Sequence, residues 1–343
     1  MSIKGKLGLT GKFVVSGLYE VVQRSWATAH ASGLLTEKKA PIPVISVGAI
    51  AIGGSGKTPV TMFIAGKLKA FGYSPVICSR GYKGAYRGSY CVVSNGRLPT
   101  PLVTPEICGD EPYLMASRLE TVPVVVARRR IDAVRASVEQ LDCNVAILDD
   151  GFQHLGLYRN INLVLLNAQK DWMFPRGRLR EPFGALNRAD AILLSGSTEE
   201  LPPEAKGPIE KKPVYKMIQE ADSIINGVDH EESSLDIFKD RAVFLVSGIA
   251  NPERFEKMAR QLGWDVVEHA IFRDHERVSD DDLAGLISRA GNQPIVLTEK
   301  DWVKAPEWFR RLSNSYYLRI KVSIEHEPEF LQLLIESVQK HES

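Results

Sequence analysis

The chain of 343 residues has few cysteines and almost no net charge. Its four cysteines, Cys78, Cys91, Cys108 and Cys143, are scattered and show no C-x-x-C spacing. This distribution argues against a disulfide framework or a zinc site and fits a reducing cytosol. The formal net charge of +1 provides no overall positive field that would attract nucleic acid. We therefore expect neither a disulfide-stabilised secreted protein nor a nucleic-acid-binding one.

Long apolar runs are missing as well. No run approaches the roughly 18 residues of a transmembrane helix. The N-terminus also lacks the compact apolar core and small-residue cleavage site of a signal peptide, so we expect no cleavable leader. Hydrophobic residues make up 44% of the chain and charged residues 25%, as in ordinary globular proteins. The length is sufficient for two domains.

One stretch, residues 44–58 (VISVGAIAIGGSGKT), places an apolar run, a glycine-rich loop and Gly-Lys-Thr before a segment of helical periodicity. This order is typical of a phosphate-binding loop, because glycines let backbone N–H groups surround a phosphate chain. The following helix adds partial positive charge. Lys57 is expected to reach the β- and γ-phosphates of ATP, and the Thr58 hydroxyl to bind Mg²⁺. The alternative is an ordinary strand-to-helix turn, and the strict pattern would have glycine in place of Ala51. The predicted ATP-binding residues are Ala51, Ile52, Gly53, Gly54, Ser55, Gly56, Lys57 and Thr58.

A second apolar strand, predicted over residues 144–148, leads directly to Asp149 and Asp150. A carboxylate at the end of such a strand reaches Mg²⁺ directly or through water in P-loop enzymes. Both aspartates are therefore candidate metal ligands together with Thr58, and a simple turn is the alternative. Because the two motifs are independent, their joint occurrence favours a P-loop enzyme.

Three loops carry cationic side chains near predicted strand ends, where α/β sheets bind ligands. They are residues 80–84 (RGYKG), the three arginines at 128–130, and residues 176–182 (RGRLREP). Cations are disfavoured at a helix N-terminus, so the arginines at 128–130 suggest an anionic partner. The third loop could hold phosphate. Each loop could equally be solvated surface.

Asp110 and Glu111 precede a predicted helix over residues 113–119. Asp110 would suit the N-cap and Glu111 the first turn of that helix. Two adjacent acidic residues could also supply a general base, and the sequence leaves both interpretations open.

The first 40 residues contain Leu18, Val21, Val22 and Trp26 at helical spacing, with six cationic and two acidic residues and hence a net charge of +4. A cationic amphipathic helix with aromatic residues can lie in a bilayer interface and be attracted to anionic lipid. The alternative is a helix that packs on its own domain.

Composition changes over residues 197–213, which are acidic and rich in proline, and we expect a linker there. A second alternation of strands and helices follows, with its first strand predicted over residues 242–247. The predicted division is an amphipathic membrane-associating region (1–40), a P-loop kinase domain (41–212), a smaller α/β domain closing over the site (213–325) and a C-terminal helix (326–343).

The chain carries, in order, PVISVG and GGSGKTP around the P-loop, SRGYKG at 79–84, GDEP at 109–112, LDDGFQH at 148–154, LREP at 179–182, the Asp-His pair within FRDHERVSDDDL at 272–283, and LTEKD at 297–301. In this combination and order, which covers most of the chain, the motifs resemble the tetraacyldisaccharide 4′-kinase family, the lipid A 4′-kinases of Gram-negative bacteria. The chain departs from the family at Ala49, where asparagine is usual, and at residues 171–176, which are shorter than the family's Gly-Asn-Gly segment.

The resemblance implies a P-loop NTPase three-layer α/β/α domain with a second, smaller α/β domain. It implies transfer of the γ-phosphate of ATP, with Mg²⁺, to the 4′-hydroxyl of tetraacyldisaccharide 1-phosphate, giving lipid IVA. The expected location is the cytoplasmic face of the bacterial inner membrane, with peripheral attachment to the membrane surface. We also expect a monomer.

The resemblance further assigns roles to individual residues. Asp110 aligns with the family's catalytic base, and His275 aligns with the histidine that supports it. His275 belongs to the predicted second domain, so the site would be complete only when the domains close. Arg130 aligns with an arginine near the phosphates. Tyr82, Arg180 and Glu181 are candidate substrate or phosphate contacts.

Three other classes of protein are the alternatives. A P-loop switch NTPase of the metallochaperone type would be expected to carry His/Cys metal clusters. A nucleic-acid-dependent ATPase is disfavoured by the balanced charge. A non-catalytic membrane scaffold would not need the Gly-Lys-Thr and Asp-Asp motifs.

Overall fold

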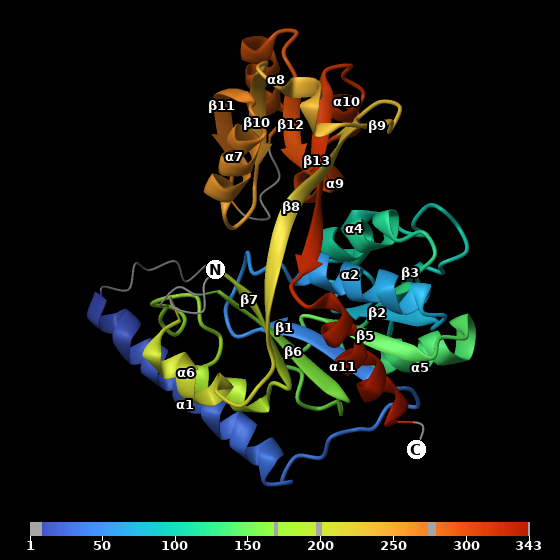
Figure 1. Cartoon of the computed structure of the whole chain (residues 1–343), viewed down its shortest axis with the longest axis vertical. Coiled ribbons are helices and arrows are strands. Elements are labelled where there is room, and N and C mark those ends of the chain that lie inside the picture. Colours follow the sequence, from blue (N-terminus) through green and yellow to red (C-terminus); the bar gives the residue numbers. More distant parts are fainter. Residues whose placement is uncertain (1–8, 168–170, 197–200, 274–278, 342–343) are drawn as a thin grey trace.

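The computed structural model describes residues 9–167, 171–196, 201–273 and 279–341. Within these ranges thirteen strands join in one mixed sheet that runs through a larger and a smaller part of the molecule (Figure 1). The order along the sheet is β11-β10-β12-β13-β8-β7-β6-β1-β5-β2-β4-β3, and β9 pairs with β8. The expected α/β class is confirmed.

The larger part has a mostly parallel sheet, in which β3 alone of its described strands runs antiparallel to its neighbour. Its central strands are buried on both faces, as the continuous apolar runs of the sequence require. The strands are β1 (Val44–Ala49), β2 (Pro75–Ser79), β3 (Cys91–Ser94), β4 (Val124–Val126), β5 (Val145–Asp149), β6 (Ile161–Asn167) and β7 (Ala191–Ser195).

Helices cover both faces of this sheet and form three layers. On one face α2, α4 and the C-terminal helix α11 share a core with the strands, and on the other face α5, α6 and η1 do so. The C-terminal helix therefore returns to the larger part. The elements are α2 (Lys57–Ala70), α3 (Pro105–Cys108), α4 (Asp110–Arg118), α5 (Arg130–Leu141), η1 (Phe183–Arg188), α6 (Pro203–Ile209) and α11 (Glu327–Gln339).

The linker predicted over 197–213 is wrong for the part that the structure describes. Residues 203–209 form helix α6, and Ala205 and Ile209 are buried against η1. Three of the prolines that suggested a linker, Pro202, Pro203 and Pro208, lie at the start of this short helix or inside it. The sequence analysis also missed the following strand, β8 (Val214–Asn226), because its charged and half-exposed residues obscure the strand pattern.

Strand β8 and strand β13 (Ser315–Ile324) are antiparallel partners and connect the two parts. The first residues of β8 pair with β7, whereas its last residues pair with β9 and β13. Figure 1 shows these two long strands rising from the larger sheet into the smaller one. The connection is thus a two-stranded ribbon rather than a loop.

The smaller part continues the sheet with three parallel strands next to β13, and helices pack on both faces. Its elements are β9 (Glu232–Ser233), η3 (Leu235–Phe238), β10 (Ala242–Ser247), α7 (Pro252–Gln261), β11 (Asp265–Ile271), α8 (Asp280–Ala290), β12 (Ile295–Thr298), α9 (Glu299–Lys304) and α10 (Glu307–Arg310).

Helix α1 (Leu9–Ala31) docks on the larger part through contacts of Ser16 and Tyr19. Ser16 Oγ donates to the Met173 carbonyl at 3.1 Å, and Tyr19 packs edge-on against Phe174. The remaining surface exposes the predicted apolar stripe: Leu18, Val21, Val22 and Trp26 are 53–63% exposed. The helix therefore packs on its own domain and still presents an apolar face. No helix within the described ranges is both long and apolar enough to span a membrane.

Candidate active site

The glycine-rich loop lies between β1 and α2, as the sequence predicts. Gly53, Gly54 and Gly56 have φ values of 75°, 55° and 85°, a left-handed conformation that side-chain-bearing residues rarely adopt. Helix α2 begins at Lys57, directly after Gly56. The loop therefore places a lysine and a helix N-terminus where an anion can be bound.

Ala51 stands where the strict motif has glycine, and its backbone explains why alanine is accepted. It is outside the left-handed region and forms a β-bridge with Leu179. On either side, Ile52 N donates to Arg178 O at 2.7 Å, and Arg180 N donates to Ile50 O at 2.7 Å. The first half of the loop is thus paired with the LREP segment, and glycine is needed only further along.

Asp149 is the last residue of β5, next to Val47 on the neighbouring strand β1. It is 2% exposed, and its two carboxylate oxygens accept hydrogen bonds from Thr61 Oγ1 at 3.4 Å and Ser79 Oγ at 3.2 Å. Burial, followed by the nearby Glu111 and Asp150 carboxylates, raises the pKa of Asp149 to about 7. The parallel sheet thus brings the two predicted motifs to one edge.

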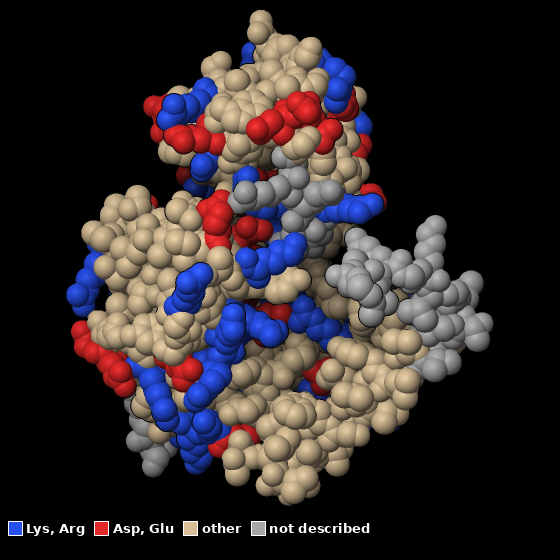
Figure 2. Space-filling view, turned by 180° about the vertical axis from the view of Figure 1, so that it is seen from behind, with Lys and Arg blue, Asp and Glu red and all other residues tan. Residues whose placement is uncertain are grey.

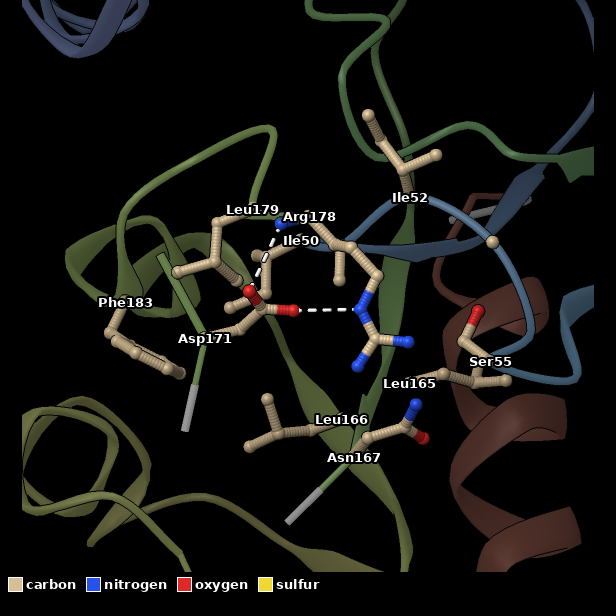
Figure 3. A pocket seen from close by; sticks show the side chains of 12 residues that line it. Ile50, Ile52, Ser55, Leu165, Leu166, Asn167, Asp171, Arg178, Leu179 and Phe183 are labelled. Carbon is tan, nitrogen blue, oxygen red and sulfur yellow. Dashed lines mark hydrogen bonds and ion pairs between the residues drawn. The ribbon is translucent and has the colours of Figure 1, made fainter. Parts of the chain in front are cut away.

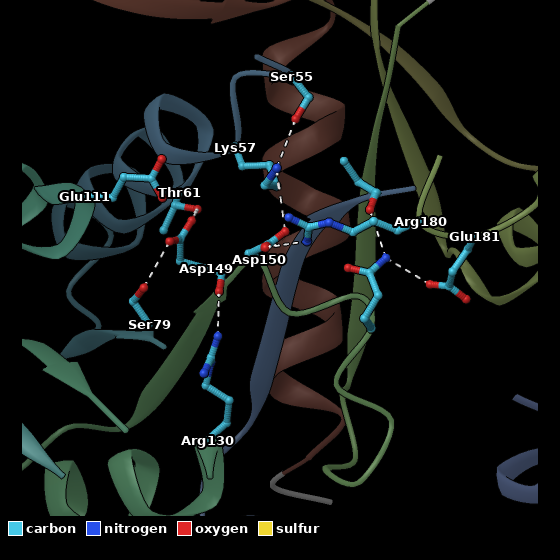
Figure 4. Close-up of polar contacts among 12 residues, drawn as sticks. Ser55, Lys57, Thr61, Ser79, Glu111, Arg130, Asp149, Asp150, Arg180 and Glu181 are labelled. Atoms are coloured by element: carbon cyan, nitrogen blue, oxygen red, sulfur yellow. Dashed lines mark hydrogen bonds and ion pairs between the residues drawn. The ribbon is translucent and has the colours of Figure 1, made fainter. Parts of the chain in front are cut away.

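Asp150 follows the strand with φ at 52° and is paired with two cations (Figure 4). Its Oδ1 lies 3.6 Å from Lys57 Nζ, and its Oδ2 accepts a hydrogen bond from Arg180 at 2.6 Å. Burial alone would raise the pKa of Asp150, but Lys57 and Arg180 outweigh it and hold the pKa below its ordinary value. Asp150 therefore links the P-loop lysine to the LREP arginine.

Arg130 is 3% exposed at the start of α5. Its guanidinium donates to the Asp149 carbonyl at 3.3 Å and to the Ala127 carbonyl at 3.1 Å. These bonds hold the end of β5 to the end of β4. The two preceding arginines, Arg128 and Arg129, are exposed.

Glu181 is also buried, at 3% exposure. It accepts a hydrogen bond from Gln153 at 2.9 Å and pairs with Arg188 at 2.5 Å. Gln153 donates as well to the carbonyl of Ala49, at 2.9 Å. The sequence analysis did not single out Gln153, although it lies within DDGFQH. Through it the LREP and DDGFQH motifs brace the end of β1.

The RGYKG and GDEP motifs lie against each other. Tyr86 N donates to Ile107 O at 3.0 Å, and a Cβ on Gly109 would stand 2.6 Å from Tyr82 O. Glycine is therefore required at 109, where φ is also 93°. The candidate contact Tyr82 is 63% exposed beside this junction.

Asp110 is the first residue of α4, and Gly109 occupies the N-cap position without any side-chain cap. The N-cap interpretation of Asp110 is therefore wrong. Glu111, the next residue, lies close enough to Asp149 to raise its pKa. The first turn of α4 thus brings the Glu111 carboxylate towards the end of β5 (Figure 4).

The smaller part contacts the glycine-rich loop at two places. A Cβ on Gly53 would stand 3.1 Å from the Cβ of Ala250, which follows β10. A Cβ on Gly56 would overlap the side chain of Gln219, a residue of β8. The sequence predicted neither contact. His275, the proposed partner of Asp110, lies outside the described residues.

A small pocket borders the P-loop beside the LREP segment (Figure 3). It is lined by Ile50, Ile52, Leu166 and Phe183, with Asp171 and Arg178 at one side. Arg178 Nε donates to Asp171 Oδ2 at 2.8 Å, and Arg178 N donates to Oδ1 at 3.0 Å. The two ends of the segment 171–178, which departs from the family pattern, are therefore joined by hydrogen bonds between Asp171 and Arg178.

Cationic side chains gather on the face shown in Figure 2, around the hollow between the two parts. Arg80 and Lys83 of the RGYKG loop and Arg128 and Arg129 are exposed. Because the net charge of the whole chain is only +1, this is a local concentration. It suits an anionic ligand.

A comparison with known families matches the model described as Tetraacyldisaccharide-1-P 4'-kinase to residues 12–339. The chain is 37% identical over 304 residues to the tetraacyldisaccharide 4'-kinase of Desulfotalea psychrophila, covering 84% of this chain and 86% of that one. It is 37% identical over 324 residues to that of Aquifex aeolicus, covering 93% and 96%.

A solved structure of the apo form of LpxK from Aquifex aeolicus in complex with ATP is similar as well. It has a TM-score of 0.79 and 36% sequence identity, and the match covers 95% of this chain and 98% of that one.

Proposed function

The chain belongs to the tetraacyldisaccharide-1-P 4′-kinase family, and from that premise we propose that it is an ATP-dependent kinase of lipid A biosynthesis. It transfers the γ-phosphate of ATP to the 4′-hydroxyl of tetraacyldisaccharide 1-phosphate and gives lipid IVA. The observation that carries the proposal is the meeting of Lys57, Asp149 and Asp150 at one edge of the sheet. The metallochaperone-type NTPase is not favoured, because the family model and the similar proteins are those of tetraacyldisaccharide 4′-kinases.

The chain's own residues are arranged for phosphoryl transfer. Residues 51–58 would surround the triphosphate of ATP, and Lys57 would contact its β- and γ-phosphates. Arg180, which is paired with Asp150 at 2.6 Å, faces the same place from the LREP segment. Arg130 and Glu181 are buried and hydrogen-bonded to neighbouring residues, so we assign them to holding the strand ends around the phosphates.

Mg²⁺ fits the residues at the end of β5. Asp150 Oδ1 is buried and accepts no hydrogen bond from any described residue, and Lys57 lies 3.6 Å away. Carboxylate and hydroxyl oxygens are the ligands that Mg²⁺ prefers. Asp150, Asp149 and the Thr58 hydroxyl would hold the ion, which neutralises developing charge on the phosphates when bound.

Asp110 is proposed as the general base and His275 as the residue that orients it. Asp110 is the first residue of α4, and its neighbour Glu111 lies near Asp149 at the end of β5. A carboxylate in this place can take the proton from the acceptor hydroxyl as it attacks. We propose that the smaller part, residues 213–325, brings His275 to Asp110 when it closes over the larger part, and that closure excludes water from the γ-phosphate.

We propose peripheral attachment to the cytoplasmic face of the inner membrane. The exposed apolar stripe of α1 supports this, because an amphipathic helix with Trp and flanking cations lies in a bilayer interface. The exposed arginines and Tyr82 beside the site suit a lipid acceptor that already bears a phosphate. We further propose that the enzyme is a monomer and that it binds no nucleic acid.

One assay tests the proposal. The purified protein is incubated with γ-labelled ATP, Mg²⁺ and the disaccharide acceptor in detergent, and labelled lipid is separated from ATP. We expect label in the lipid that depends on both acceptor and protein. Release of labelled inorganic phosphate with no labelled lipid, at any acceptor concentration, would instead favour an NTPase.

A further inference from the structure

The LTEKD motif at residues 297–301 has no place in the site described above, yet it folds into a specific local structure. Thr298 caps helix α9, and its Oγ1 accepts a hydrogen bond from Asp301 N at 3.2 Å. Asp301 is 7% exposed and accepts from Gly248 N at 2.9 Å. The cap and this bond fix α9 to the segment that follows β10.

From this fixed helix, the two middle residues of the motif reach the larger part. Glu299 is 9% exposed, and its Oε2 accepts a hydrogen bond from Arg118 Nη1 at 2.7 Å. Lys300 Nζ lies 3.3 Å from Glu111 Oε1. Arg118 and Glu111 are the last and second residues of α4. One short helix of the smaller part is therefore ion-paired to both ends of α4.

The pair between Glu299 and Arg118 belongs to a network centred on the connecting ribbon. Arg118 also lies 3.6 Å from Asp222 of β8, and Glu299 lies 3.4 Å from Arg319 of β13. The side chains of Arg118 and Glu299 are only 17% and 10% exposed. Charges withdrawn from water in this way need a defined geometry, so the network favours one arrangement of α4 against the ribbon.

Helix α4 is the element that carries the proposed base. Its Leu114, Met115 and Ala116 are buried, and Asp110 and Glu111 are its first two residues, with Glu111 near Asp149. The same motif also governs the second contact with the nucleotide site, because Asp301 holds Gly248, two residues before Ala250, which lies over Gly53. A small displacement of α9 would therefore move both Asp110 and the segment around Ala250 that lies over the P-loop.

We propose that Glu299, Lys300 and Asp301 are positioning residues that clamp helix α4 to the smaller part and thereby set the place of Asp110 relative to the P-loop. The proposal rests on the kinase function proposed above. The effect of the three residues is on the alignment of the acceptor hydroxyl, the base and the γ-phosphate, where errors of about 1 Å can cost about 100-fold in rate.

The test compares two substitutions of the same kind. Glu299→Gln keeps the size of the side chain and removes the charge that holds Arg118. Glu268→Gln does the same to the exposed pair of Glu268 with Arg289, whose atoms are 2.8 Å apart and which lies wholly within the smaller part. Both variants are assayed for kcat with the lipid acceptor, for ATP affinity without acceptor, and for thermal unfolding. Arg118→Lys, which keeps the charge but loses the planar fork, is the milder second variant.

We expect Glu299→Gln to lower kcat at least 10-fold while the ATP dissociation constant changes less than 3-fold. Glu268→Gln should leave both within 2-fold. In an Asp110→Asn background, adding Glu299→Gln should lower kcat little further, because the base that Glu299 positions is already lost. A full additional loss in that background would overturn the proposal, as would an unchanged kcat in both Glu299→Gln and Arg118→Lys.

Amide hydrogen exchange tests the positioning of α4 without any measurement of activity. Glu299→Gln should speed amide exchange in α4, at residues 113–118, relative to the wild type and to Glu268→Gln. Unchanged exchange there would overturn the clamp. If the wild type transfers no phosphate to the acceptor but the exchange result holds, the proposed function fails and the clamp stands.

Discussion

Lys57 of the glycine-rich loop and Asp150 of the DDGFQH motif form an ion pair in which Nζ and Oδ1 are 3.6 Å apart. The two residues are 93 positions apart in the chain, as their numbers show, and they meet because β1 and β5 are neighbours in the sheet. The lysine is thus held over the end of β5 by a carboxylate that Arg180 also holds. Before ATP binds, the Lys57 side chain is therefore already held in position to contact the phosphates.

Replacing Lys57 with alanine is expected to abolish transfer of phosphate to the lipid acceptor, because the loop loses its point charge on the β- and γ-phosphates. Folding should survive, since Asp150 keeps its pair with Arg180. The measurement is the labelled-lipid assay together with a thermal melt. The control is Lys67→Ala, which removes another lysine of helix α2. Lys67 pairs with Glu327, and this variant should remain active. Near-normal turnover of Lys57→Ala would refute the P-loop assignment.

Asp110 and His275 are expected to act as one unit. Asp110→Ala and His275→Ala should each lower kcat by roughly 10²–10⁴-fold, the usual range for general acid–base groups. The double variant should lower kcat little more than either single variant, because the first substitution already removes the interaction between the two residues. ATP binding should change little in either variant. The measurement is a double-mutant cycle on kcat, and fully multiplicative losses would mean that the two residues act separately.

The apolar face of α1 is expected to bind membranes. The triple variant Leu18→Ser, Val22→Ser, Trp26→Ser should bind anionic vesicles at least ~10-fold more weakly, because interfacial binding scales with the apolar area that is buried. Unlike deletion of the first 30 residues, it keeps the contact between Ser16 and Met173. The control replaces Val228, Val267 and Ile271, which are 53–54% exposed on the smaller part. Equal flotation of the triple variant and the wild type would show that the stripe does not bind membranes.

His154 is expected to make stability depend on pH. Burial, followed by nearby cations of which Arg130 is the strongest, lowers its pKa from 6.5 to about 4. The unfolded chain therefore binds a proton at His154 that the folded chain does not, between about pH 6.5 and pH 4. Because protons favour the unfolded state in this window, stability is lost as the pH falls through it.

The measurement is the free energy of unfolding in urea at about pH 7.5 and about pH 5. The wild type should lose more stability between the two than His154→Gln does. His326→Asn, a change at an exposed histidine, serves as the control and should follow the wild type. A His154→Gln variant that loses as much as the wild type would contradict the prediction.

Gly48 is expected to be required for packing. A Cβ at this position would stand 2.5 Å from Phe152 Cβ and 2.8 Å from Phe152 N, in the turn that follows Asp150. Gly48→Ala should therefore lower the free energy of unfolding by about 1–3 kcal/mol, as overpacking does. Gly66→Ala is the matched control, because its Cβ would meet nothing within 4 Å in α2, and it should be neutral or stabilising by up to about 1 kcal/mol. Equal stabilities of the two variants would contradict the packing argument.

The sequence by itself determined the local elements of the site. Glycines at 53, 54 and 56 predicted the loop because the left-handed backbone found there needs them. The apolar run before Asp149 predicted a strand whose end carries a carboxylate, and the parallel sheet confirms it. These signals are local, since they depend on backbone conformation and on a few neighbouring side chains.

Tertiary structure alone decided how these elements combine. Asp150 pairs with Lys57 and Arg180, Glu299 pairs with Arg118 across 181 positions, and Ala250 lies over Gly53. No local pattern encodes such contacts, because they depend on which strands become neighbours and on how the ribbon of β8 and β13 carries the smaller part. Strand β8 of the ribbon escaped the sequence analysis for the same reason, because its residues are charged and half-exposed and only its pairing with β13 and with the larger sheet makes it a strand.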